Sequence, residues 1–367
     1  MIKIFLKLLI LAIGIASALA VWQKEQLSIF ALVQIDPLPE TKMLINQEQY
    51  AQAHEYLSFF LEFDYVKNNP EAQEIYKQIN KKRNELEYKA KKITQGIITG
   101  TSDETIGQVA SVVSDFFVFG DIRDLTIQGI NYARGEESDK LLIALSTIGI
   151  VATGAQLASA TATVTTAGVA TPTLITSSAT KSAITTLKAA KRAGHIPPWL
   201  RKKILDIAKT SKKTKKVGDF VDIANDINKL AKTKGGIRML KQTSDPASLK
   251  QMIQFSKTFG EHSAIIYKFG GKTALAIAKN SQKQTKHALR LATTYGKEGI
   301  EALGKMGSVK FLKYTSRASK IAYKGDALRL IAKKLLKIPN WVFFAAMALS
   351  LIVWLPKRSK DKLNRTF

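Results

Sequence analysis

The chain of 367 residues contains no cysteine, only four histidines, and no charged residue between positions 141 and 180. The lack of cysteine excludes disulfides, thiolate metal ligands and a cysteine nucleophile. No histidine lies three or four residues from another, which excludes the His-Glu-x-x-His helix of zinc proteases. The four positions are His54, His195, His262 and His287.

Other catalytic motifs are missing as well. No Gly-x-Ser-x-Gly nucleophile turn occurs. The run Gly270-Gly271-Lys272-Thr273 is similar to the end of a phosphate-binding loop, but Ile266 stands where that loop needs its first glycine. We therefore predict no cofactor, no metal site and no catalytic residue, and we favour a non-enzymatic protein. An enzyme whose site assembles from distant residues is an alternative.

Acidic residues are scarce in the second half of the chain. Residues 23–140 carry 13 Lys/Arg and 19 Asp/Glu, net −6, whereas residues 181–367 carry 41 and 10, net +31. This asymmetry indicates an anionic neighbour for the basic half, for which we expect anionic lipid headgroups or an acidic protein face. Lysine outnumbers arginine, and no nucleic-acid-binding module is recognisable, which argues against nucleic acid.

An apolar stretch begins the chain. Residues Ile4–Trp22 are interrupted only by Lys7, and Lys3 precedes them. Ala18-Leu19-Ala20 fits a signal-peptidase site, so a removed signal peptide is one interpretation. The stretch is long for a signal peptide and close to a full membrane span, which favours an uncleaved signal anchor. In either case the chain after residue 22 starts outside the cytoplasm, because the positive end stays inside.

A second apolar stretch lies near the end. Residues Ile338–Pro356 carry no charge, and Trp341 and Trp354 lie near its two ends, as in interfacial aromatic belts. We predict a transmembrane helix at 338–356 that starts near Pro339. Basic residues flank the stretch on both sides, so its own sequence leaves its orientation open.

The uncharged stretch at 141–180 has two interpretations. Residues Leu141–Ala158 are apolar enough for a third span or part of a re-entrant hairpin, or they form a buried core helix. If the stretch crosses once, the basic half lies in the cytoplasm. If it does not cross, the whole body lies outside. The sequence leaves both open.

The acidic region at 23–140 is expected to be helical. Asn69-Pro70-Glu71 predicts a helix start, because asparagine caps and proline suits the first turn. Beside the uncharged stretch, three aspartates surround one arginine. This arrangement is either a functional cluster, such as a cation site or an ion-pair switch, or helix capping with a surface ion pair. The four residues are Asp115, Asp121, Arg123 and Asp124.

Several of these features together resemble a set of uncharacterised envelope proteins of Gram-negative bacteria. The resemblance covers about Asn69–Ile150. It rests on Asn69-Pro70-Glu71, the run from Gly120 to Leu125, and the Leu-Ser-Thr-Ile-Gly run at Leu145–Gly149. It implies an origin in a bacterial envelope and an organised fold, and it implies no activity.

Glycines recur at a fixed interval in the basic half. Gly235, Gly271 and Gly307 follow one another at 36 residues, and Gly260 and Gly296 repeat that interval. A unit of this length holds two helices and their turns, as in an α-solenoid. Chance similarity in a Lys/Gly/Ala-rich chain is the alternative.

The densest basic cluster follows Pro198-Trp199-Leu200 and is a candidate contact for an anionic surface. A solvated helix face is the simpler interpretation. The cluster consists of Lys202, Lys203, Lys209, Lys212, Lys213, Lys215 and Lys216.

Together these patterns predict an all-α, membrane-anchored protein with terminal transmembrane helices and α-hairpin repeats in its C-terminal half. The expected parts are 1–22 (signal anchor or signal peptide), 23–140 (acidic helical domain), 141–180 (uncharged segment), 181–337 (basic helical domain), 338–356 (transmembrane helix) and 357–367 (basic tail). We expect a membrane-anchored scaffold or binding protein of the bacterial inner membrane, with 23–140 extracytoplasmic. Alternatives are a membrane-active, toxin-like protein and an enzyme with a dispersed site at the aspartate cluster.

Overall fold

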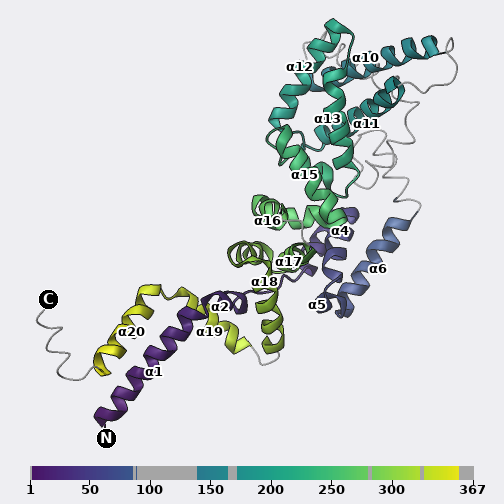
Figure 1. The fold of residues 1–367 in the computed structure, drawn as a ribbon. Coiled ribbons are helices and arrows are strands. Elements are labelled where there is room, and N and C mark those ends of the chain that lie inside the picture. The colour runs from purple at the N-terminus through teal and green to yellow at the C-terminus, as the bar shows by residue number, and fades with distance from the viewer. Residues whose placement is uncertain are drawn as a thin grey trace, which may run out of the picture. The chain divides into compact units, whose positions relative to one another are not determined.

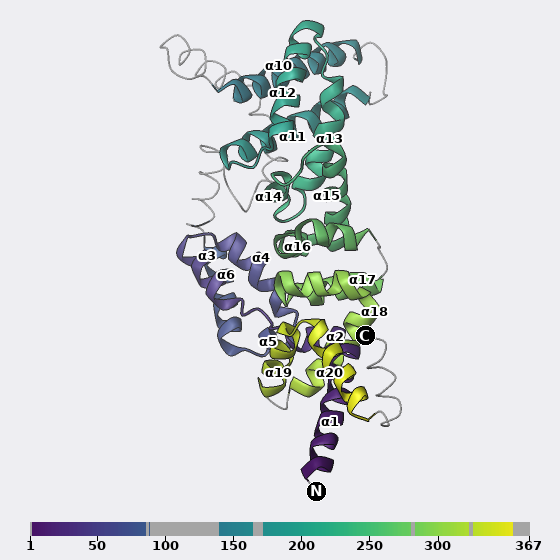
Figure 2. The same ribbon diagram turned by 90° about the vertical axis from the view of Figure 1, so that its left-hand side faces the viewer.

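The computed structural model describes residues 2–85, 88, 139–163, 172–279, 283–322 and 326–354. These residues form helices, turns and loops, and no strand occurs among them, which confirms the all-α prediction. The chain divides into two compact units. One joins residues 1–35 to 280–367, and the other comprises residues 36–279 (Figures 1 and 2).

The first unit is built from both ends of the chain. Its helices are α1 (Ile2–Trp22), α2 (Lys24–Phe30), α17 (Lys283–Thr293), α18 (Gly296–Ala322), α19 (Asp326–Lys337) and α20 (Asn340–Trp354). The short α2 packs on α18 and α19, and α17 packs on α18. Ile29, Leu289 and Phe311 are buried in this unit. Burial of these apolar side chains is the main favourable term that holds helices from distant parts of the chain together.

The second unit contains the remaining described helices. They are α3 (Leu38–Asn46), α4 (Tyr50–Leu61), α5 (Asp64–Lys67), α6 (Pro70–Asn84), α10 (Lys140–Thr163), α11 (Pro172–Arg192), α12 (Pro198–Thr214), α13 (Gly218–Ala231), α14 (Gly236–Leu240), α15 (Pro246–Phe259) and α16 (Ser263–Ala278). A 3₁₀ turn, Gly260–His262, connects α15 to α16.

Local capping explains several helix starts in this unit. The Asn69 side chain accepts hydrogen bonds from the backbone N–H groups of Glu71 and Ala72, which confirms the start predicted for α6. Asp245 and Ser248 form a reciprocal capping box at the start of α15. Each cap satisfies backbone donors that the first turn of a helix leaves unpaired.

The uncharged stretch begins as a packed helix. The described side chains of α10 include Leu145 and Ile148, which are fully buried, and α10 packs on α11 and α12. On the neighbouring α12, the Trp199 indole N–H donates to the Thr243 carbonyl oxygen at 3.1 Å. The first part of the stretch therefore contributes to the core of the second unit.

The five regularly spaced glycines all have a positive φ, although their ψ angles differ. Gly235, Gly271 and Gly307 have φ of 70°, 49° and 78°, and Gly260 and Gly296 have φ of 56° and 67°. Residues with a Cβ rarely adopt such angles. The glycines begin or break helices, since Gly235 precedes α14 while Gly271 and Gly307 interrupt α16 and α18. The 36-residue repeat itself stays a prediction, because a repeat requires matching helix packing as well as matching turns.

Candidate functional site

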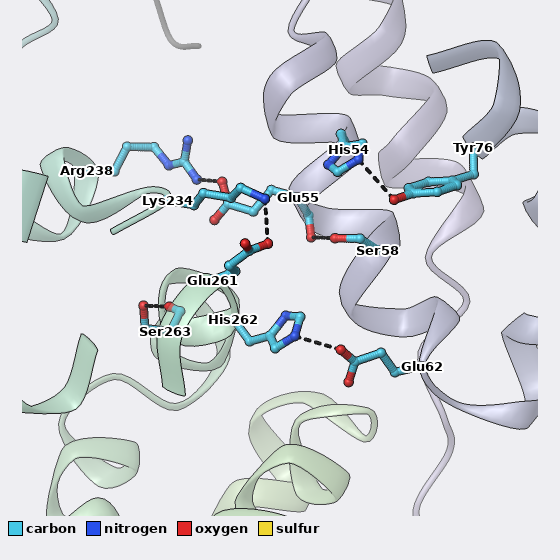
Figure 3. Close-up of polar contacts among 11 residues, drawn as sticks. His54, Glu55, Ser58, Glu62, Tyr76, Lys234, Arg238, Glu261, His262 and Ser263 are labelled. Atoms are coloured by element: carbon cyan, nitrogen blue, oxygen red, sulfur yellow. Dashed lines mark hydrogen bonds and ion pairs between the residues drawn. The ribbon is translucent and has the colours of Figure 1, made fainter. Parts of the chain in front are cut away.

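A buried ion pair joins α4 to α14 in the second unit. Glu55 is 6% exposed, and its Oε2 lies 2.6 Å from Arg238 Nη2 (Figure 3). The other carboxylate oxygen, Oε1, is buried and has no hydrogen-bond partner within the described part of the chain. The pair fits only because position 235 is a glycine. A Cβ on Gly235 would lie 2.8 Å from both Glu55 Oε1 and Arg238 Nη2.

More polar contacts continue along the same side of α4. Glu62 lies 2.7 Å from His262 Nε2, and Lys234 pairs with Glu261 (Figure 3). On α4 itself, His54 Nε2 lies 2.9 Å from the Tyr76 hydroxyl of α6. Figure 3 therefore shows acidic side chains of α4 facing basic side chains and a histidine from the 234–262 segment. No group of three metal-ligating side chains was found within the described residues.

Burial sets the protonation of His262. Desolvation lowers the pKa of its imidazole below the ordinary value of 6.5, and Lys234 acts in the same direction. Glu261 acts against this shift. In its neutral form His262 donates its Nε2 proton to the Glu62 carboxylate, so the contact does not need a charged imidazole.

A pocket of about 600 Å³ opens between α3–α4 and α14–α16. This volume lies in the range of small-molecule sites. Side chains from residues 40–56 and 238–272 meet there, and three are cationic while one is anionic. They are Glu40, Leu44, Gln52, Tyr56, Arg238, Met239, Gln242, Ala264, Ile265, Tyr267, Lys268 and Lys272, with Gly271.

Lys268 is held beside this pocket by two neighbours. It pairs with Glu40, and its Nζ lies 4.8 Å from the centre of the Tyr56 ring, a cation–π distance. Burial raises the pKa of Tyr56 far above its ordinary value, with Glu40 as a further cause. The Tyr56 hydroxyl is therefore a neutral donor at physiological pH.

The predicted lysine cluster lies on an exposed surface. Lys202, Lys203, Lys209, Lys212 and Lys213 are on α12, Lys215 and Lys216 follow it, and all seven side chains are exposed. The opposite face of α12 buries Leu200, Ile204 and Ile207. The aspartate cluster at 115–124 lies outside the described residues.

Helices α1 and α20 form an antiparallel pair in the first unit (Figure 1). Near the start of α1, the Trp354 indole N–H donates to the Lys7 carbonyl oxygen at 3.2 Å. Just after the end of α1, Lys24 Nζ donates to Asn340 Oδ1 at 2.5 Å. The start of α1 and the end of α20 therefore lie at the same end of the pair.

Small residues form the contact between the two helices. A Cβ on Gly14 would lie only 2.1 Å from Ser350 Oγ, and Ser17 and Ser350 are buried. Large apolar side chains point away from this contact and are 50% or more exposed. They include Ile4, Phe5, Leu6, Ile13, Ile15, Phe344, Leu349 and Leu351. Close packing at small residues with exposed apolar flanks is typical of helices in a bilayer.

By length and composition, residues 4–22 of α1 form a candidate membrane span. At 19 residues they measure about 28 Å, close to the thickness of a bilayer core. Helix α20 has 15 residues, fewer than the stretch predicted from 338 to 356. It meets the same criterion only together with residues 329–337 of α19, from which it is bent by 89°.

Comparison of the chain with models of protein families, with curated proteins and with solved structures finds no match. The geometry of the described residues is therefore the basis for the functional proposals below.

We predict that acid destabilises the second unit through two half-buried histidines. Burial lowers the pKa of both His195 and His262 in the folded state. As the pH falls below about 6.5, the two histidines bind protons in the unfolded chain before they do so in the folded chain. The free energy of unfolding is therefore highest above about pH 6.5, and it decreases as the pH approaches the lower folded-state pKa values. Thermal unfolding of the full chain between pH 7.5 and 5.5 measures the slope. His262→Gln should make it shallower, and an unchanged slope would assign the effect to other groups.

We also predict that α1 and α20 pair in the membrane as they do here. Because the chain has no cysteine, the double variant Ser17→Cys/Ser350→Cys contains a single thiol pair, and it leaves the close approach at Gly14 unchanged. Oxidation in membranes should form an intramolecular disulfide, detected by a mobility shift or by peptide mass. The control pair Ile13→Cys/Ser350→Cys should react poorly, because Ile13 is 50% exposed. Equal yields from both pairs would contradict the helix contact.

Proposed function

We propose that the chain is a membrane-anchored, non-enzymatic scaffold or binding protein of the bacterial envelope, in the inner membrane. The observation that carries this proposal is the antiparallel packing of α1 on α20 through Gly14, Ser17 and Ser350, with large apolar side chains on their outer faces. Exposed apolar surface of this kind is costly in water and stable in lipid.

The packing also supports an uncleaved anchor. Cleavage after Ala20 would remove most of α1 and leave Ser350 without the helix that covers it. Of the two interpretations of the N-terminal stretch, the signal anchor is therefore the one that keeps this contact.

An antiparallel pair of spans fixes the topology that we propose. Lys3 and Lys7 lie on the side where α20 ends, and five basic residues follow α20, at positions 357, 358, 360, 362 and 365. Positive flanks favour the cytoplasm, so both chain ends lie inside. The body between α1 and α20, including residues 23–140, is then extracytoplasmic. The burial of α10 side chains supports this reading, because a core helix at 141–158 adds no crossing.

Helix α19 suits a position along the membrane surface. It is bent by 89° from α20, so it lies parallel to the bilayer plane if α20 crosses it upright. Its exposed side chains combine Leu330 and Ile331 with Lys333, Lys334 and Lys337. Apolar side chains that enter the interface beside lysines at the headgroups are characteristic of interfacial helices.

Tryptophans mark the same boundary. Trp22 and Trp341 are 80% and 70% exposed, and they lie at the end of the α1–α20 pair where α20 begins. Exposed tryptophan is favoured at the level of the lipid headgroups. We therefore assign this end of the pair to the extracytoplasmic interface, next to α19.

The lysine face of α12 is the proposed contact with an anionic partner. The five exposed lysines of α12 lie away from the apolar side that α12 packs on the core, and two more exposed lysines follow the helix. Anionic lipid headgroups or an acidic protein face would neutralise them, with each lysine contributing about 1 kcal/mol near a charged membrane.

Reporter fusions test the proposed topology. An export-dependent reporter inserted after Lys213 should be active, and the same reporter after Phe367 should be inactive. A reporter active only in the cytoplasm should give the opposite pattern at both sites. If both fusions report the same side, or if Lys213 is found inside, the antiparallel pair does not span the membrane as proposed.

Charge removal tests the α12 surface. The full chain in nanodiscs is mixed with anionic vesicles, and vesicle capture is measured at rising salt. Lys203→Gln, Lys209→Gln and Lys213→Gln together should weaken capture at least tenfold, because about 1 kcal/mol per lysine is lost. The matched control removes the exposed Lys241, Lys250 and Lys257. An equal loss in both sets would indicate a general charge effect without a specific surface.

A further inference from the structure

The pocket beside α4 has an apolar floor. Leu44, Tyr56, Met239, Ala264 and Ile265 line it, and all five side chains are buried. They come from α3, α4, α14 and α16, so the floor is complete only when these helices are packed together. A floor of this composition favours an alkyl or aromatic group over a sugar or a bare ion.

The rim of the pocket is cationic, and two of its three cations already have partners. Arg238 pairs with Glu55, and Lys268 pairs with Glu40. Lys272 lines the pocket, is exposed, and forms no salt bridge with a described residue. It is therefore the rim cation whose charge is available to a ligand.

Neutral donors add to this rim. The side chains of Gln52, Gln242 and Tyr267 line the pocket together with Lys272. Amide and phenol groups donate hydrogen bonds to carboxylate or phosphate oxygens, and such charge-assisted bonds are stronger than neutral ones. The rim thus favours an anionic head group, while the floor favours an apolar tail.

We propose that this pocket binds a single-chain anionic amphiphile, with its tail on the floor and its carboxylate or phosphate at Lys272. This rests on the proposed function in one respect, namely that the membrane beside the anchor supplies such molecules. A cationic amphiphile would be repelled at the rim, and a small hydrophilic anion would leave the floor without contacts.

Photo-crosslinking of the full chain in nanodiscs tests this proposal. The probes share one dodecyl chain with a diazirine and differ in the head group, which is a carboxylate, a phosphate or a trimethylammonium. Peptide mass spectrometry then locates the adducts. The anionic probes should label peptides that contain Leu44, Met239 or Ile265, and the cationic probe should not. The stronger of the two anionic probes identifies the head group.

One substitution at the rim distinguishes the pocket from partition into lipid. Lys272→Glu should lower labelling of the floor by the anionic probes about tenfold, as loss of a charge-assisted contact predicts. Lys279→Glu is the control, because Lys279 is exposed near the end of the same helix and does not line the pocket. Labelling of α1 and α20 in the same sample measures how much of each probe has entered the bilayer.

The outcomes separate this proposal from the membrane anchor. Equal labelling of the floor by anionic and cationic probes, or labelling of α1 and α20 alone, overturns the pocket proposal and leaves the anchor standing. Labelling of the floor without labelling of α1 and α20 supports the pocket and overturns the anchor.

Discussion

The buried pair of Glu55 and Arg238 is the contact on which the second unit depends. It joins residues 183 positions apart and brings the acidic N-terminal region against the basic region. Removing Arg238 would leave the buried Glu55 carboxylate without its cation, which is the costly change, whereas Arg238 is 34% exposed and water can solvate it when Glu55 is removed. The left-handed turn at Gly235 leaves the space that both side chains occupy.

This pairing changes the meaning of the charge asymmetry. The net −6 and +31 regions suggested an external anionic partner, yet some of the charge is used inside the protein. Arg238, Lys268 and Lys234 each pair with an acidic residue of the same unit. The lysines of α12 remain exposed to solvent. Part of the positive charge is therefore paired within the protein, and the exposed lysines of α12 and Lys272 at the pocket rim are among those that a partner could reach.

The membrane anchor rests on a different physical basis. Where α1 passes α20 at Gly14 and Ser350, small side chains allow the two backbones to approach closely. Outside this contact the exposed side chains are large and apolar. A soluble helix pair would bury its large residues and expose its polar ones. The inverted arrangement is the feature of the first unit that supports the proposed membrane anchor.

The sequence predicted local features better than tertiary ones. Helical content, the cap at Asn69 and the start of α20 after Pro339 follow from rules that act within one turn of a helix. The spaced glycines were recognisable because a backbone with positive φ restricts residue choice. The 89° bend before α20 was not predicted, because proline marks a helix boundary but not the angle between helices.

The pocket could not have been predicted by these means. Its lining comes from residues 40–56 and 238–272, and no motif connects them. The only sequence signal was the opposite charge of the two regions, which indicates attraction without specifying which residues meet. Lys272 illustrates the difficulty. In the sequence it belongs to a weak phosphate-loop similarity, whereas in the structure it lies on the rim of a pocket between helices.

The pairing of α1 with α20 also imposes an order on biogenesis. If both helices span the membrane as proposed, α1 enters it long before α20 is synthesised, because more than 300 residues separate them. During that interval the body would be exported and would fold while held by one helix, and the glycine–serine surface of α1 would face lipid without its partner. A chain that stops before α20 keeps its attachment but not the helix contact. The unpaired surface then distinguishes an incomplete molecule from a finished one.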